Sequence, residues 1–302
     1  NAKVAIVQAT GLMQENETAK AMQLLHNVSE SIAWLPGYGN LRSQIVAQLQ
    51  LTKRMEAASQ LHVIVDQLRS LDGPRTLPDN QLRAIAERCE QVWNRRQQLA
   101  DALGIEPNGI VPSAAEQQEP RTDLLDLAIL WTDLRIRLAH GGEATAMRKL
   151  SEKTLLEAIR LVGPTPVVYQ EIARHLKYAG LLTEAQKYAA MSCDMPPQSA
   201  WEHYASGRSL LRSTRFAEAE SELRLATSLA PDDYWYQFHA GVVAFRLGKF
   251  SDAVAAFGAC IALEPQRAEC YHHRGLAFEE NHQPDRAKAD FAQAQRLAEK
   301  SL

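Results

Sequence analysis

The side chains best suited to chemistry gather near the C-terminal end of the chain. Cys270, His272 and His273 lie close together, and Cys260 precedes them. Thiolates and imidazoles are preferred ligands of zinc, and a zinc site needs about four of them converging tetrahedrally. Only the step from Cys270 to His273 has helical spacing, and Cys260 falls at a position expected to pack inside the fold. We therefore predict no metal site and no cofactor.

Motifs of known reactions are missing from the sequence. It contains no Gly-rich phosphate loop, no serine nucleophile elbow and no paired-histidine zinc motif. We predict that the chain is not an enzyme and that it has no catalytic residue. An enzyme whose motifs are not recognisable remains an alternative hypothesis. Stoichiometric binding of zinc would support it.

A period of 34 residues organises the C-terminal part of the chain. The residues that recur at this interval are Gly207, Gly241 and Gly275; Ala185, Ala219, Ala253 and Ala287; and Pro197, Pro231 and Pro265. This pattern marks a tetratricopeptide array, in which each repeat is a helix–turn–helix hairpin. We predict an all-α fold, a right-handed α-solenoid of these repeats preceded by longer helical hairpins.

The recurring residues have distinct roles in such a hairpin. The glycines and alanines lie where the two helices cross, so that only a small side chain fits there, and the prolines stop the second helix. Large residues fill the remaining space at Leu223, Phe257 and Phe291. The first repeat departs from the pattern, because Ala189 stands where a large residue is expected.

Polar and proline-containing breaks divide the chain into five parts. We predict a helical hairpin over 1–36, which resembles a degenerate repeat, and a long helical hairpin over 37–104. A linker follows over 105–121, and Thr122 begins an adaptor hairpin over 122–164. The array covers 165–302, with repeats at 165–198, 199–232, 233–266 and 267–302.

One side of the first helix of each repeat is predicted to line a concave groove. The residues on that side are Arg174, Tyr178, Trp201, Tyr204, Arg208, Arg212, Trp235, Phe238, His239, Arg246, His272 and His273. Aromatic and arginine side chains are over-represented at binding hot spots, and such a groove suits a peptide with acidic and apolar residues. Two alternatives stay open: about half of these residues pack between repeats, or the chain's own N-terminal helices fill the groove.

Composition limits the partners. The formal net charge of -3 provides no basic field, so we predict no binding to nucleic acid. No apolar run approaches the ~20 residues that span a bilayer, so we predict no membrane insertion. Four cysteines in a chain of this length favour a reducing compartment and a cytoplasmic location. Because Asn1 is the first residue, we expect an excised piece of a longer protein.

Residues 122–131, 200–211 and 268–275 resemble the C-terminal regions of large bacterial serine/threonine protein kinases that carry tetratricopeptide repeats. The resemblance implies a regulatory or docking region, with the kinase domain itself as one partner. The kinase motifs are absent, since His273-Arg274-Gly275 and Val4-Ala5-Ile6-Val7 lack the required Asp and Lys. The leading hypothesis is therefore a module that binds a peptide or protein, and the alternative is a structural module for self-association or scaffold assembly.

Overall fold

The computed structural model describes residues 2–15, 17–34, 38–72, 77–106 and 115–300. These residues form helices and turns and contain no strand, which confirms the all-α prediction. The chain divides into two compact units. The first unit comprises Asn1–Leu68, Pro78–Met147 and Lys153–Gly163, and the second comprises Arg69–Leu77, Arg148–Glu152 and Pro164–Leu302.

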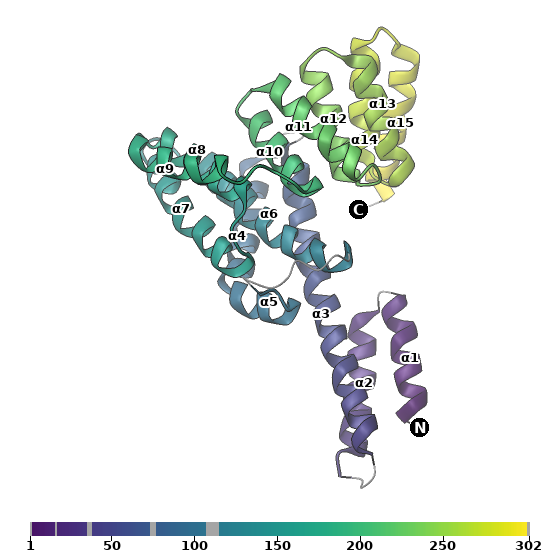
Figure 1. The fold of residues 1–302 in the computed structure, drawn as a ribbon. Coiled ribbons are helices and arrows are strands. Elements are labelled where there is room, and N and C mark those ends of the chain that lie inside the picture. Colours follow the sequence, from purple (N-terminus) through teal and green to yellow (C-terminus); the bar gives the residue numbers. More distant parts are fainter. Residues whose placement is uncertain (1, 16, 35–37, 73–76, 107–114, 301–302) are drawn as a thin grey trace. The chain divides into compact units, whose positions relative to one another are not determined.

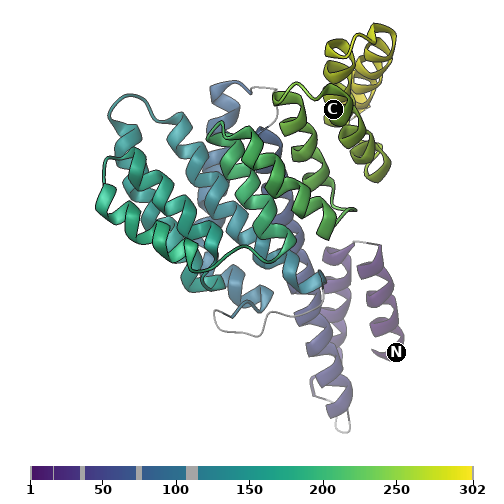
Figure 2. The same cartoon turned by 45° about the horizontal axis from the view of Figure 1, so that its top comes forward.

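The second unit contains four helix pairs, one for each predicted repeat. Their bounds are α8 (Pro166–Tyr178) with α9 (Leu182–Cys193), α10 (Ala200–Arg212) with α11 (Phe216–Leu229), α12 (Tyr234–Arg246) with α13 (Phe250–Leu263), and α14 (Ala268–Glu280) with α15 (Pro284–Lys300). The two helices of each pair pack on one another, and the pairs follow in chain order from teal to yellow (Figures 1 and 2). This arrangement is the predicted solenoid of hairpins.

Close approach of the paired helices explains the recurring glycines. A Cβ atom added to Gly207 would lie 2.6 Å from Cγ of Leu223. One added to Gly241 would lie 2.7 Å from Cε1 of Phe257, and the fourth repeat has the same arrangement at Gly275. Contacts this short are sterically forbidden, so the glycine and the large residue opposite it form one packing unit in each of these three repeats.

The turn inside each repeat uses a left-handed backbone conformation. Gly180 and Gly248 have φ values of 81° and 73° in the first and third repeats, where glycine carries no steric cost. Thr214 and His282 occupy the same turn in the second and fourth repeats with φ values of 59° and 56°. A β-branched threonine in this region is strained, so the packing of the paired helices holds the turn in place.

The helices of the first unit are α1 (Ala2–Gln14), α2 (Thr18–Ile32), α3 (Gly39–Arg69), α4 (Asp79–Asn94), α5 (Arg96–Leu103), α6 (Ala115–Leu138) and α7 (Glu143–Val162). The last residue of α3, the short helix η1 (Ser70–Asp72) and residues 148–152 of α7 belong to the second unit. Ala9, Ala21 and Leu25 are buried in one core with Ile45 of α3, and α1 packs on α2. The predicted hairpin over 1–36 stays an interpretation. Among the described residues, no helix is both long and apolar enough to cross a membrane.

The predicted linker over 105–121 is wrong in its second half. Helix α6 begins at Ala115 and includes Pro120, so Thr122 lies inside a helix rather than at its start. Most of residues 124–134 are buried and apolar, and their packing offsets the lost backbone hydrogen bond and the steric clash that Pro120 introduces near the start of the helix. Residues 107–114 of the expected linker, like the expected breaks at Pro36, Gly37, Gly73 and Pro74, lie outside the described residues. The division into five parts stays an interpretation.

The crossing in the third repeat yields a test with a matched control. Both Gly241→Ala on α12 and Gly258→Ala on α13 gain the same helix propensity, about 1 kcal/mol. A Cβ at Gly258 would lie 3.9 Å from Arg274, which is ordinary contact, whereas a Cβ at Gly241 would enter the buried ring of Phe257. We expect Gly241→Ala to be less stable than Gly258→Ala by about 1–3 kcal/mol, measured by urea unfolding followed by circular dichroism. Equal stability of the two variants would contradict this account of the glycine.

Candidate functional site

A cleft of about 780 Å³ lies between α8, α9 and α10 in the first repeat. Its volume is in the range of about 300–1,000 Å³ that is common for ligand pockets. The apolar residues that line it are Ala173, Leu182, Ala185, Ala189 and Leu210, and the polar ones are Gln170, Arg174, Lys177, Tyr178, Gln186, Ser209, Ser213 and Arg215. All of them belong to the second unit.

The cleft exists because the first repeat lacks a large residue. In the second and third repeats, Leu223 and Phe257 are buried against a glycine of the partner helix. The equivalent residues in the first repeat are Ala173 and Ala189, and both line the cleft. Helix α9 also packs more weakly on α10 than α11 does on α12. Ala189 stands where the repeat pattern has a large residue, and the structure has an open space at this position.

Two large side chains, one aromatic and one aliphatic, stand exposed at the cleft. Tyr178 at the end of α8 is 61% exposed, and Leu182 at the start of α9 is 58% exposed. The guanidinium of Arg148 lies 5.4 Å from the centre of the Tyr178 ring, a cation–π contact that favours a fixed ring position. Exposed aromatic and aliphatic groups beside a cavity are a common feature of interaction sites.

The charged residues at the cleft are cationic. Arg174, Lys177 and Arg215 line it, and no carboxylate does. The nearest acid along α8 is Glu171, which is fully buried and accepts hydrogen bonds from Nε of Arg174 at 2.9 Å and from Arg212 at 3.1 Å. Burial opposes ionisation of Glu171, but the charges of these arginines hold its pKa below the usual range. Arg174 is therefore paired with Glu171, and Lys177 and Arg215 are the more exposed cations that line the cleft.

The structure separates the twelve predicted groove residues into two groups. The buried ones are Trp201, Tyr204, Arg208, Trp235, Phe238, His239 and His273. Several pack on one another, with ring centres 5.5 Å apart for Trp235 and Phe238 and 5.2 Å apart for Phe238 and His273. Burial of these seven side chains fits the alternative that many of the twelve pack between neighbouring helices.

The remaining five residues are at least partly exposed: Arg174, Tyr178, Arg212, Arg246 and His272. The structure brings Arg174 and Tyr178 together at the cleft, whereas Arg246 and the buried His273 line a small apolar pocket of about 60 Å³ with Phe257. Their role in binding a peptide stays a prediction. Lys177 and Leu182 are not among the twelve predicted groove residues, although the missing large residue at Ala189 pointed to this part of the repeat.

The cysteines considered as zinc ligands are packed in the array. The thiol of Cys270 donates to Oη of Tyr234 at 3.2 Å, and that of Cys260 donates to the carbonyl of Tyr234 at 3.6 Å. Burial raises the pKa of the Cys260 thiol far above its ordinary value. Since a thiolate rather than a thiol binds metal, these contacts favour a structural role.

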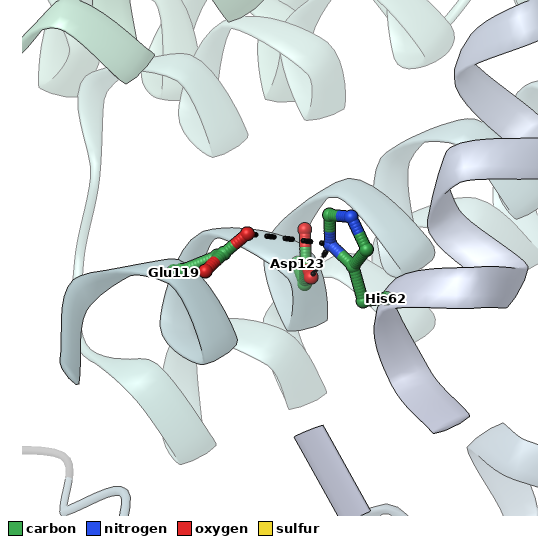
Figure 3. Close-up of side chains that lie close together, drawn as sticks. All are labelled: His62, Glu119 and Asp123. Atoms are coloured by element: carbon green, nitrogen blue, oxygen red, sulfur yellow. Dashed lines mark hydrogen bonds and ion pairs between the residues drawn. The ribbon is translucent and has the colours of Figure 1, made fainter. Parts of the chain in front are cut away.

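A cluster of possible cation ligands lies in the first unit. His62 on α3 points toward Asp123 and Glu119, which lie one turn apart on α6 (Figure 3). Nδ1 of His62 lies 2.9 Å from Oδ2 of Asp123 and 3.5 Å from Oε1 of Glu119. The contact with Asp123 is a hydrogen bond that joins the two helices, and we treat the cluster as structural. The sequence carried no signal for it, because His62 is remote from α6 along the chain.

Comparisons with known proteins give a distant likeness only. No family model matches the chain, and no curated protein matches it. A solved structure of MamA is 18% identical, with 53% of this chain and 93% of that chain covered and a TM-score of 0.41. YrrB, described as a TPR protein with an unusual peptide-binding site, is 15% identical, with 57% and 84% covered and a TM-score of 0.39. MamA from Desulfovibrio magneticus RS-1 is 16% identical, with 59% and 97% covered and a TM-score of 0.41. At these TM-scores the likeness carries no argument about the site.

His273 gives the array a dependence on pH. Burial, with the neighbouring His272 and His239, lowers the pKa of His273 from 6.5 to about 3. Between these values the unfolded chain binds the proton and the folded chain does not, so the free energy of unfolding falls as pH falls from 6.5 toward 3, by at most about 1.4 kcal/mol per pH unit.

We expect His273→Phe to lose less stability on acidification than the unmodified chain, as measured by urea unfolding at a series of pH values. His282→Asn is the control, since this residue is exposed and asparagine tolerates its left-handed backbone. An identical pH dependence for His273→Phe and the unmodified chain would show that His273 does not bind the proton on unfolding.

Proposed function

We propose that this chain is a protein–protein interaction module, and that its array binds a segment of another protein in the cleft between α8, α9 and α10. The observation that carries the proposal is an open cleft lined by apolar residues, with Tyr178 and Leu182 exposed beside it. Stacked helix pairs form extended binding surfaces. The unfilled space beside Ala173 and Ala189 is a place on such a surface where a partner's side chain can bind. The role is binding rather than catalysis.

A more specific proposal concerns the kind of protein to which this chain belongs. We infer a regulatory or docking region of a bacterial serine/threonine protein kinase in the cytoplasm. The support is the resemblance of residues 122–131, 200–211 and 268–275 to such regions, together with the low number of cysteines. In this proposal the kinase domain itself is one partner. The reading frame of the parent gene tests it, because a different neighbouring domain would contradict the kinase assignment.

Self-association is the second candidate function. Leu225 and Leu229 are 44% and 57% exposed on α11, outside the cleft, and a paired apolar surface of this kind can bury itself in a dimer. Light scattering over a range of concentrations separates the two functions. A monomer that captures a peptide supports the interaction module, and a concentration-dependent dimer without peptide binding supports self-association.

The interaction proposal predicts which exposed residues matter. Peptides selected by the intact chain from a displayed random library should bind at least about tenfold more weakly to the double variant Tyr178→Ala with Leu182→Ala, since truncation of a hot-spot residue costs about 1–2 kcal/mol. The matched control is Leu225→Ala with Leu229→Ala, which removes another exposed pair of large side chains elsewhere in the array. Fluorescence anisotropy measures the affinity, and far-ultraviolet circular dichroism verifies the helices. Failure to select any peptide, or equal effects of both double variants, would disprove the proposal.

A further inference from the structure

We propose that the first repeat recognises an acidic segment of a partner protein that inserts one large apolar side chain, of the phenylalanine or leucine class, beside Ala173 and Ala189. This inference rests on the proposed function and specifies the chemistry of its ligand. In effect, the partner supplies the side chain that the repeat itself lacks.

The geometry of the other repeats indicates what fits. In the third repeat the ring of Phe257 is buried against Gly241, and in the second Leu223 is buried against Gly207. The corresponding space in the first repeat is bounded by Ala173, Ala185 and Leu210. A side chain like those of Leu223 and Phe257 therefore matches the apolar lining, and its removal from water would favour binding.

The charges at the cleft determine what flanks that side chain. Arg174, Lys177 and Arg215 line the cleft without an acidic residue among the lining set. Arg215 pairs with Glu218, but both groups are more than half exposed, so that ion pair is weak and can be exchanged for one with a ligand. Lys177 is exposed at the rim of α8. Because Arg174 is already paired with the buried Glu171, aspartate or glutamate on either side of the inserted residue would meet Lys177 and Arg215, and a basic segment would be repelled.

The exposed pair Tyr178 and Leu182 extends this match beyond the cleft. Both stand at the turn between α8 and α9, beside the basic residues. A ligand with an apolar centre and acidic flanks would cover Tyr178 and Leu182 while its charges reach Lys177 and Arg215. Nucleic acid also carries negative charge, but it offers no aliphatic or phenyl side chain for the space beside Ala189, so an acidic polypeptide fits better.

Filling the cleft tests the inserted side chain directly. The double variant Ala173→Gly with Ala189→Phe recreates the glycine–phenylalanine pair of the third and fourth repeats, and the glycine is needed because a Cβ there would collide with the ring. The control is Ala190→Phe, which adds the same side chain at an exposed neighbouring position outside the cleft. The probes are the peptides that the intact chain selects from the displayed library. We expect the filled variant to weaken their binding at least about tenfold and Ala190→Phe to change it less than about twofold.

Reversing one charge tests the acidic flanks without altering the core. Lys177→Glu should weaken the selected peptides about tenfold, and raising the salt concentration should weaken them in the unmodified chain. Lys288→Glu, on the exposed face of the fourth repeat, is the control and should have little effect. We also expect the selected peptides to share one large apolar residue flanked by Asp or Glu.

The outcomes separate the two proposals. Peptides that lose binding with Tyr178→Ala and Leu182→Ala, yet bind the filled variant and Lys177→Glu normally, would support the interaction module and overturn the inserted acidic segment. Selected peptides that lack acidic residues would also overturn it. If the filled variant unfolds at a lower urea concentration than the unmodified chain, the result with Lys177→Glu decides, because that substitution is on the surface.

Discussion

The structure of the array depends on one steric constraint, the crossing of two helices at a residue without a side chain. At Gly207, Gly241 and Gly275 the partner helix places a leucine or phenylalanine where a Cβ atom would otherwise lie. This contact fixes the distance between the paired helices, and in the second and third repeats the large residue is buried from solvent. The 34-residue period arises because this contact recurs in successive repeats.

The candidate site arises where the same constraint is relaxed. In the first repeat, Ala173 replaces the glycine and Ala189 replaces the large residue. The Cβ atom of Ala173 therefore meets no large side chain, and the space between the two helices stays unfilled. The two changes are complementary, because Ala173 would conflict with a large side chain at Ala189 but not with an empty space. The scaffold thus keeps its helix pair while leaving a vacancy lined by apolar and cationic groups.

Sequence reasoning predicted the repeats well because their spacing reports directly on helix crossing. It was less successful with the groove, since helical periodicity places Trp201, Phe238 and His273 on one side of a helix without revealing that neighbouring helices bury them. It also treated Pro120 as a break, although the apolar face of α6 extends the helix past it. The cluster at His62 depends on contacts between distant segments, which no local pattern encodes.

The loose packing of α9 on α10 has a mechanical consequence. In a stacked array, the cohesion of neighbouring repeats is a sum of interface contributions, and the contribution between the first and second repeats is weaker than those that follow. A looser joint favours local opening that leaves the later repeats folded, and the pair of Glu171 on α8 with Arg212 on α10 opposes it. A ligand bound between the first and second repeats would add contacts there. The resistance of the first repeat to local unfolding would therefore depend on whether the cleft is occupied.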